Sequence, residues 1–273
     1  LQLEGLVKGG AFDDLDKNRA KVYESIPSII NQVKVSNENK SSNQKNLFNE
    51  NIAEDYSKTL FTNIKKNQWT KNELLKKEFE SLGFFLSDHP LNSFKEFLDQ
   101  NKILDFDKFI NSNNKEGKIA GTLLSLNEKK SSKGTNFAIA KFSDLSGDYE
   151  LFIFSEILNL NRENLKDSNS FIITLIKETS ENGENLRRLT VKDIKTLDYY
   201  INSSYEKVLI EIDPNQNYAE LNSLLKNNGN TEILLGFMKN DKFIEFKLNG
   251  SRKFDFNTYK TIKNKEYVKK IVI

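Results

Sequence analysis

Apolar side chains recur every three to four positions in two stretches of the N-terminal third, and this period predicts helices. The first stretch spans residues 20–33, where Pro27 is expected to kink or split the helix because it lacks a backbone N–H. The second spans residues 70–82, and Gly83 is placed to end it. A further short helix is predicted over residues 92–101, so residues 69–115 are predicted to form a helical connector.

Between these helices, residues 36–51 lose the period and almost all apolar content, which predicts a solvated linker that we extend to residue 68. Within it, the sequence QKNLF places Leu47 and Phe48 side by side. An exposed Leu-Phe pair costs solubility and is typical of a short peptide that folds into an apolar pocket on a partner. Gln44 can anchor such a peptide because its amide both donates and accepts hydrogen bonds. The alternative is that the pair packs back onto its own domain.

The pattern changes between residues 116 and 197. Five short runs rich in Ile, Phe, Leu, Val and Thr are separated by turn-like segments such as KKSSKG, LSGD and SENGEN, which predicts five strands. A segment with helical spacing, SEILNLNRENLKD, lies between the third and the fourth run. Three strands, a helix and two strands follow the order of an OB-fold β-barrel, whose closure hides the edges of short strands.

After residue 205 the sequence predicts a strand (KVLIEID), a helix (YAELNSLLKNN) and a hairpin that turns at Asn240 and Asp241. These elements predict a small α+β C-terminal domain over residues 205–273. The predicted fold class is therefore a multi-domain α+β protein with a helical connector, a five-stranded OB-fold β-barrel and this small domain.

The predicted barrel offers a surface for single-stranded nucleic acid, which OB-folds bind with their second and third strands and adjoining loops. Alternation along the second strand places Ala138, Ala140 and Phe142 on one face, and the opposite face, which includes Lys141, is predicted to be the open one. The candidate nucleic-acid-binding residues are Lys129, Lys130, Lys133, Phe137 and Lys141. OB barrels also hold proteins and oligosaccharides, and the three loop lysines could be ordinary solvated charges. With so few cations, the affinity for single strands is expected to be weak and strongly salt-dependent.

Composition and charge limit the other possible functions. The 273 residues, of which 37% are hydrophobic, are enough for two or three packed domains. No run of 18 apolar residues occurs and the first ten residues lack the features of a signal peptide, so we expect a cytoplasmic protein with no membrane segment. The net charge is +2, from 41 basic and 39 acidic residues, so any nucleic-acid binding has to be local. The sequence does not begin with Met and is expected to be a piece of a longer chain.

Known catalytic and metal-binding motifs are missing from the sequence. Cysteine is absent, and His89, the only histidine, precedes Pro90 and is expected to have a structural role. The motifs GxxxxGK[ST], GxGxxG, GxSxG and HExxH do not occur, and no closely spaced pair of carboxylates lies in an apolar strand. We therefore expect no catalytic residue, no metal and no cofactor in this chain.

Four segments together carry a family resemblance: LVKGGAFDDLDKNRA, QKNLF, LGFFLSDHPL and KGTNFAIAKFSDLSGDYELFIFSE. In this order and at these separations they resemble the C-terminal region of the alpha subunit of bacterial replicative DNA polymerase III. LGFFLSDHPL is similar to that family's LGFYLSGHPL, with Asp88 in place of the usual Gly. The resemblance covers about residues 4–160, is weaker to residue 197, and beyond residue 205 rests on element order and position.

The resemblance implies contacts with DNA and with replication proteins. Residues 1–35, with Lys8, Gly9 and Gly10, fall in the tail of a helix-hairpin-helix region that in this family holds duplex DNA by its backbone. The linker residues Gln44, Leu47 and Phe48 match the family's internal sliding-clamp motif. The barrel, residues 116–197, is similar to the one that meets the single-stranded template. Residues 205–273 occupy the position of the contact for the clamp loader's tau subunit.

The activity implied by the resemblance belongs to a longer chain. In this family the catalytic aspartates and a phosphoesterase-like domain lie upstream of the region that this chain resembles. The upstream part is also where the polymerase would bind Mg²⁺ and deoxynucleoside triphosphates. The chain is therefore expected to be the C-terminal part of a DNA-directed DNA polymerase, which is a nucleotidyltransferase. Its expected function is to bind the sliding clamp and the single-stranded template and to contact other replisome proteins during DNA replication. The alternatives are a stand-alone OB-fold protein that binds single-stranded nucleic acid, or an assembly module that binds only protein.

Overall fold

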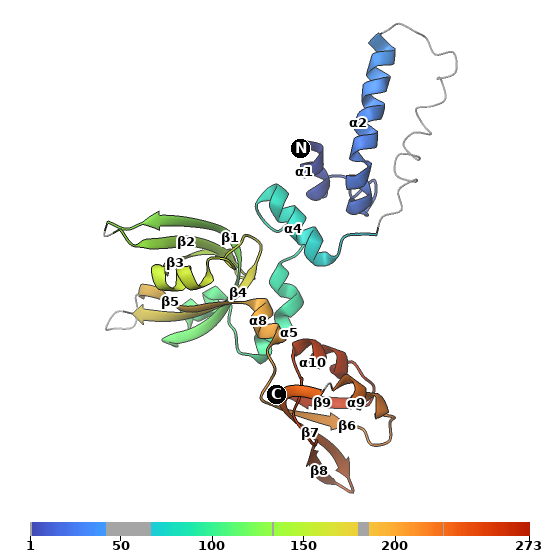
Figure 1. Cartoon of the computed structure of the whole chain (residues 1–273), viewed down its shortest axis with the longest axis vertical. Coiled ribbons are helices and arrows are strands. Elements are labelled where there is room, and N and C mark those ends of the chain that lie inside the picture. The colour runs from blue at the N-terminus through green and yellow to red at the C-terminus, as the bar shows by residue number, and fades with distance from the viewer. Residues whose placement is uncertain (1, 42–66, 133, 180–185, 226) are drawn as a thin grey trace. The chain divides into compact units, whose positions relative to one another are not determined.

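The computed structural model describes residues 2–41, 67–132, 134–179, 186–225 and 227–273, which form two compact units, Leu1–Ser93 and Phe94–Ile273 (Figure 1). The first unit is helical. The second contains two β-sheets with short helices around them. The predicted multi-domain α+β fold class is confirmed.

The first unit begins with α1 (Gln2–Lys8) and α2 (Arg19–Ser41). Val7, Val22 and Ile26 are buried together between these helices. Pro27 lies at an exposed position inside α2, so the predicted split does not occur, and the alternative of a kink stays a prediction. Because α2 continues to Ser41, the segment predicted to be a linker from residue 36 is helical for its first six residues.

The helix α4 (Lys71–Leu82) has both of its ends fixed by local sequence. Thr70 caps the N-terminus by accepting a hydrogen bond from the backbone of Glu73, whose side chain in turn accepts from the backbone N–H of Thr70. Gly83 ends the helix with a φ of 79°, a left-handed conformation that favours glycine, and this confirms the prediction. The 3-10 helix η1 (Pro90–Phe94) follows.

The second unit opens with α5 (Lys95–Gln100) and α6 (Phe106–Asn111) and continues into a five-stranded antiparallel sheet. Its elements are β1 (Glu116–Lys130), β2 (Asn136–Ser143), β3 (Asp148–Phe154), α7 (Ser155–Asn161), β4 (Ser170–Thr179) and β5 (Leu186–Thr196). The predicted order of three strands, a helix and two strands is confirmed.

The long first strand joins the two halves of this sheet, whose order is β3-β2-β1-β4-β5. Residues 116–122 of β1 pair with β4 and residues 122–130 pair with β2, with an irregularity between Leu123 and Ser125. Such irregularities allow a strand to bend. The two outermost strands of the order, β3 and β5, also contact each other. This arrangement is consistent with the predicted barrel, but the OB-fold assignment itself stays a prediction.

Two buried polar side chains make hydrogen bonds to the backbone, one within the sheet and one from the sheet to α6. Tyr149 on β3 donates its hydroxyl to the carbonyl of Ala120 on β1 over 3.1 Å, and burial raises the pKa of this tyrosine well above its usual value. A Cβ at Gly121 would lie 2.2 Å from that hydroxyl oxygen, so only glycine fits there. Lys177 on β4 is also buried, and its ammonium donates to three backbone carbonyls at the C-terminal end of α6.

The last part of the chain forms a four-stranded sheet in the order β8-β7-β6-β9. After α8 (Leu197–Asn202) come β6 (Lys207–Ile212), α9 (Ala219–Leu224), β7 (Asn227–Lys239), β8 (Lys242–Lys247), α10 (Phe256–Lys263) and β9 (Val268–Val272). β6 and β7 are parallel and the other pairs are antiparallel.

The hairpin predicted at Asn240 and Asp241 is confirmed, and both residues have positive φ angles, 49° and 59°, as tight two-residue hairpin turns require. The sequence reasoning did not predict α10 and β9. Within the described residues, no helix is both long enough and apolar enough to span a bilayer.

Candidate nucleic-acid interface

The two faces of β2 separate as the alternation predicted. Ala138, Ala140 and Phe142 are fully buried in the core of the five-stranded sheet. Phe137 and Lys141 are only partly buried on the opposite face. We call this opposite face of β1, β2 and β3 the outer face.

Aromatic rings collect on the outer face. Strand pairing places Phe137 of β2 directly opposite Phe154 of β3, and Ile139 opposite Phe152. Phe152 is 50% exposed and Phe154 is 42% exposed. The rings of Phe137 and Phe152 are 6.4 Å apart and inclined by 29°. Exposed rings on neighbouring strands can each stack on a nucleic-acid base.

The predicted lysines do not all lie on this face. Lys129 pairs with Phe137 across β1 and β2, so it lies on the outer face. Lys130 pairs with Asn136, and because successive residues of a strand point to opposite sides, it lies on the other face. Lys133 lies outside the described residues.

Lys141 is on the outer face, but an acidic neighbour already pairs with it. Its ammonium is 2.9 Å from the carboxylate of Asp148, and this hydrogen bond raises the pKa of Lys141. Glu150 lies directly opposite Lys141 in the strand pairing. Lys141 therefore offers less free positive charge to a phosphate than the sequence suggested.

The structure adds a cation that the sequence reasoning missed. The guanidinium of Arg188 on β5 lies 5.7 Å from the centre of the Phe154 ring, within the range of a cation–π contact. Phe152 and Phe154 were missed as well, although alternation along YELFIF could have revealed them. Arg188 had no such signal because its partner lies on a different strand.

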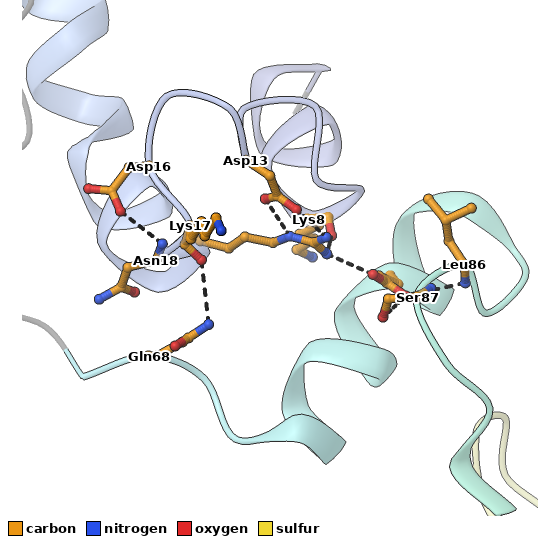
Figure 2. Close-up of polar contacts among 10 residues, drawn as sticks. Lys8, Asp13, Asp16, Lys17, Asn18, Gln68, Leu86 and Ser87 are labelled. Atoms are coloured by element: carbon orange, nitrogen blue, oxygen red, sulfur yellow. Dashed lines mark hydrogen bonds and ion pairs between the residues drawn. The ribbon is translucent and has the colours of Figure 1, made fainter. Parts of the chain in front are cut away.

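A second polar cluster lies in the first unit, around Arg19 (Figure 2). The guanidinium donates to both carboxylate oxygens of Asp13, over 2.7 and 2.6 Å, and to the backbone carbonyl of Lys8. It also donates to Glu78 over 2.7 Å. The hydrogen bonds with Asp13 are the largest cause of the raised pKa of Arg19.

The carboxylate of Glu78 is fully buried and has a second set of donors. Its other oxygen accepts from the backbone N–H groups of Leu86 and Ser87 and from the Ser87 hydroxyl, at 3.0 to 3.2 Å. Figure 2 draws Leu86 and Ser87 in the segment that follows α4. With its oxygens satisfied on all sides, Glu78 joins α4 to the start of α2 and has a structural role.

The glycine turn at residues 9–10 leaves space for the Arg19 side chain of the same cluster. A Cβ at Gly10 would lie 2.4 Å from the Arg19 guanidinium, and the φ of Gly10 is 85°. The ammonium of Lys8 is 3.0 Å from the carboxylate of Glu80. The contacts of Lys8 and Gly10 within the unit are thus explained by folding, and the assignment of residues 1–35 to the tail of a helix-hairpin-helix region stays a prediction.

His89 and its neighbour form local contacts. The imidazole Nδ1 of His89 accepts from the backbone N–H of Leu91, and its ring packs edge-on against Phe85. Asp88, which stands where the family pattern has Gly, pairs with Lys71; with further hydrogen bonds, this contact lowers the pKa of Asp88 to about 2. Among the described residues, no group of three or more His, Asp or Glu side chains could hold a metal ion.

The predicted clamp-binding residues Gln44, Leu47 and Phe48 lie outside the described residues. Their role stays a prediction from the sequence.

Comparison with known proteins finds DNA polymerase III alpha subunits. No family model matches the chain. Proteins named DNA polymerase III subunit alpha from Rickettsia prowazekii and Borreliella burgdorferi are 29% and 26% identical over 227 and 266 residues, or 82% and 92% of the chain. The protein of that name from Buchnera aphidicola is 33% identical over 162 residues, 58% of the chain. The chain covers 18%, 23% and 14% of these three relatives.

Proposed function

We propose that this chain, which is homologous to the C-terminal part of bacterial DNA polymerase III alpha subunits, binds single-stranded template DNA through its outer face. The chain spans about a fifth of the length of the curated relatives that it matches, so the DNA polymerase activity of a longer chain is part of the proposal. The observation that carries template binding is the group of rings on the outer face of two adjacent strands, where Phe152 and Phe154 are exposed and Phe137 is partly buried. A cytoplasmic location follows from a role in replication.

Stacking supplies the affinity in this proposal, and charge adds a smaller share. Each base stacked on an aromatic ring is worth about 1–3 kcal/mol, whatever the base. Within the part of the chain that the structure describes, Lys129 and Arg188 are two cations on or beside the outer face that could contact phosphates. Two phosphate contacts to a single strand give a slope of about −1.4 in log affinity against log salt. Binding is therefore expected to be tolerant of sequence. Its dependence on salt is expected to be weaker than the sequence suggested, because Lys141 is paired with Asp148 and Lys130 lies on the other face.

The test is the double variant Phe152→Ala with Phe154→Ala, titrated against a fluorescently labelled oligothymidine. Loss of two stacking rings is expected to weaken binding by about 2–6 kcal/mol, which is about thirtyfold or more in affinity. The matched control is Leu160→Ala, which removes a 75% exposed apolar side chain from α7. If the double variant binds as tightly as the control, template binding by the outer face is wrong.

A charge reversal separates template binding from the alternative that the barrel binds only protein. Lys129→Glu is expected to weaken oligonucleotide binding, whereas Lys130→Glu, which makes the same change in net charge on the opposite face, is expected to have little effect. Equal effects of the two variants would point to a diffuse field, and no effect of either would favour the assembly module.

Clamp binding is the second part of the proposal, and the sequence match of Gln44, Leu47 and Phe48 to the family motif supports it. A tether of this kind raises the effective concentration of the polymerase at the primer end without new base contacts. Leu47→Ala with Phe48→Ala is expected to abolish binding to an immobilised sliding clamp while oligonucleotide binding is unchanged. Unchanged clamp binding by this variant refutes the assignment.

The remaining segments keep their predicted roles as proposals. Residues 1–35 are the tail of a helix-hairpin-helix region, residues 69–115 the helical connector and residues 116–197 an OB-fold. The linker, predicted over residues 36–68, is proposed for residues 42–68, because α2 continues to Ser41. Residues 205–273 contact the tau subunit of the clamp loader, and position along the chain supports this role.

A further inference from the structure

The four-stranded sheet has one face packed against helices. Val208 and Ile210 of β6 and Ile233 of β7 are fully buried on this face, with Leu235 beside them. The helices contribute buried side chains of their own, among them Leu221 from α9 and Tyr259 and Ile262 from α10. We call this the covered face.

The helices are too short to cover all of it. α10 has eight residues and is about 12 Å long. β7 has 13 residues and spans about 43 Å. Figure 1 shows the β7–β8 hairpin extending beyond α9 and α10.

The hairpin continues the covered face as an apolar shelf. Strand pairing places Phe237 opposite Ile244 and Leu235 opposite Phe246, so all four lie on the same side as the buried core. The rings of Phe237 and Phe246 are 6.3 Å apart, edge to face. Ile244 and Phe246 are 40% and 44% exposed. We define the hairpin shelf as Leu235, Phe237, Ile244 and Phe246.

Positive charge borders the shelf. Lys239 and Lys242 are directly opposite each other at the tip of the hairpin, in the same alternating set as the shelf residues. Neither makes an ion pair with any residue that the structure describes. The nearest acid along the chain is Asp241, in the turn between them. Glu232 belongs to the opposite face, where it pairs with Lys207 and Lys247.

Edge-to-edge pairing of β8 with the β8 of a second copy of the chain is disfavoured. If two β8 strands paired edge to edge in antiparallel register, Lys242 of each would meet Lys247 of the other. Like charges directly opposite each other destabilise a strand pair, and lysines on an edge strand are a common protection against such pairing.

We propose that the hairpin shelf docks an amphipathic helix of a partner protein, with acidic residues beside its apolar stripe. Such a helix would extend the layer formed by α9 and α10, bury the two exposed side chains of the shelf and bring carboxylates to Lys239 and Lys242. This inference rests on the proposal that residues 205–273 bind a partner, and it specifies the surface and the chemistry of that contact.

The test uses the full chain and a labelled synthetic helix of about 16 residues with Leu at one face and Glu elsewhere. The comparison peptide has Lys in place of every Glu. The acidic peptide is expected to bind at least about tenfold more tightly, and Lys239→Glu with Lys242→Glu is expected to reverse the preference. Equal affinity of the two peptides for the wild-type chain overturns the proposal.

A matched pair of variants locates the surface. Phe246→Ser removes a shelf residue, and Phe243→Ser removes a residue of the same type, on the same strand and equally exposed at 44%, from the opposite face, where it packs over Gly236. Phe246→Ser is expected to weaken acidic-peptide binding at least about fivefold and Phe243→Ser to leave it unchanged. Circular dichroism checks that both variants fold. If both variants weaken binding equally, or if the chain forms a dimer that Phe246→Ser dissociates, the proposal is wrong.

Titration with the tau subunit distinguishes failure of the shelf from failure of the proposed partner. Tau binding that is lost in Phe246→Ser and kept in Phe243→Ser supports the shelf as its site. If tau binds both variants equally, the hairpin shelf is not its site, but tau is still supported as the partner of this chain. If tau does not bind the wild-type chain, the proposal that tau is the partner is wrong. The peptide titrations then still test whether the hairpin shelf docks an acidic amphipathic helix.

Discussion

Replacing Glu78 with alanine is expected to lower the free energy of unfolding of the first unit by about 3–5 kcal/mol, the usual cost of breaking a buried ion pair from one side. The carboxylate is fully buried, and its loss leaves Arg19 without one of its acceptors. It also removes the acceptor for the backbone N–H groups of Leu86 and Ser87. Arg19 is buried and loses a charged acceptor, and two part-buried N–H groups lose theirs, so the expected cost lies above that of an ordinary hydrogen bond.

The measurement is urea unfolding followed by tryptophan fluorescence. Trp69 is the only tryptophan of the chain and lies in the first unit, where its ring packs against Tyr23, so its emission reports on this unit alone. The matched control is Glu80→Ala, two residues further along α4. Glu80 forms an exposed ion pair with Lys8, whose loss is expected to cost about 0.2–1 kcal/mol. If the two variants differ by less than about 1 kcal/mol, the buried cluster does not stabilise the unit as argued.

Three further predictions concern single contacts. Lys177→Met is expected to destabilise the second unit by about 1–3 kcal/mol in thermal unfolding, because three backbone carbonyls lose their buried donor; a variant as stable as the wild type would refute this. Lys71→Ala is expected to raise the pKa of Asp88 from about 2 toward 3.8 in an NMR titration. The stabilisation from Asp88 is present above about pH 4 and is lost as the pH falls through about 2, since protonation breaks the pair. Gly121→Ala is expected to lower the melting temperature, because the new Cβ would lie 2.2 Å from the Tyr149 hydroxyl oxygen. Tyr149→Phe in the same chain should relieve part of this loss, and an equal loss in both backgrounds would show that the clash is not the cause.

The elements that the sequence predicted correctly are those with a strong local signal. The five strands and their helix, the stop at Gly83 and the turn at Asn240 and Asp241 each depend on a period or a residue type within a few positions. The end of α2 was placed too early because residues 36–41 lack an apolar stripe, although a solvated helix can continue without one. The short helix α10 and the edge strand β9 were not predicted from their own sequences.

The candidate site shows the same division. Alternation alone identified the outer face of β2 and with it Phe137 and Lys141. It did not show that Lys129 and Lys130 lie on different faces, which required the register of β1 against β2. The similarity to replication proteins was identified from short motifs in the sequence. One of these motifs, QKNLF, lies outside the described residues.

The sequence by itself determined which elements form, in which order, and which side of each strand is apolar, because these properties depend on neighbours along the chain. Only the tertiary structure decided which charges are free and which are paired. Lys141 forms an ion pair with Asp148 on another strand. Arg188 on β5 contacts the ring of Phe154 on β3. Glu78 on α4 forms an ion pair with Arg19 on α2, a helix that is far from α4 in the sequence. Such contacts join residues far apart in sequence, and their geometry depends on strand register and helix packing, which no local pattern encodes.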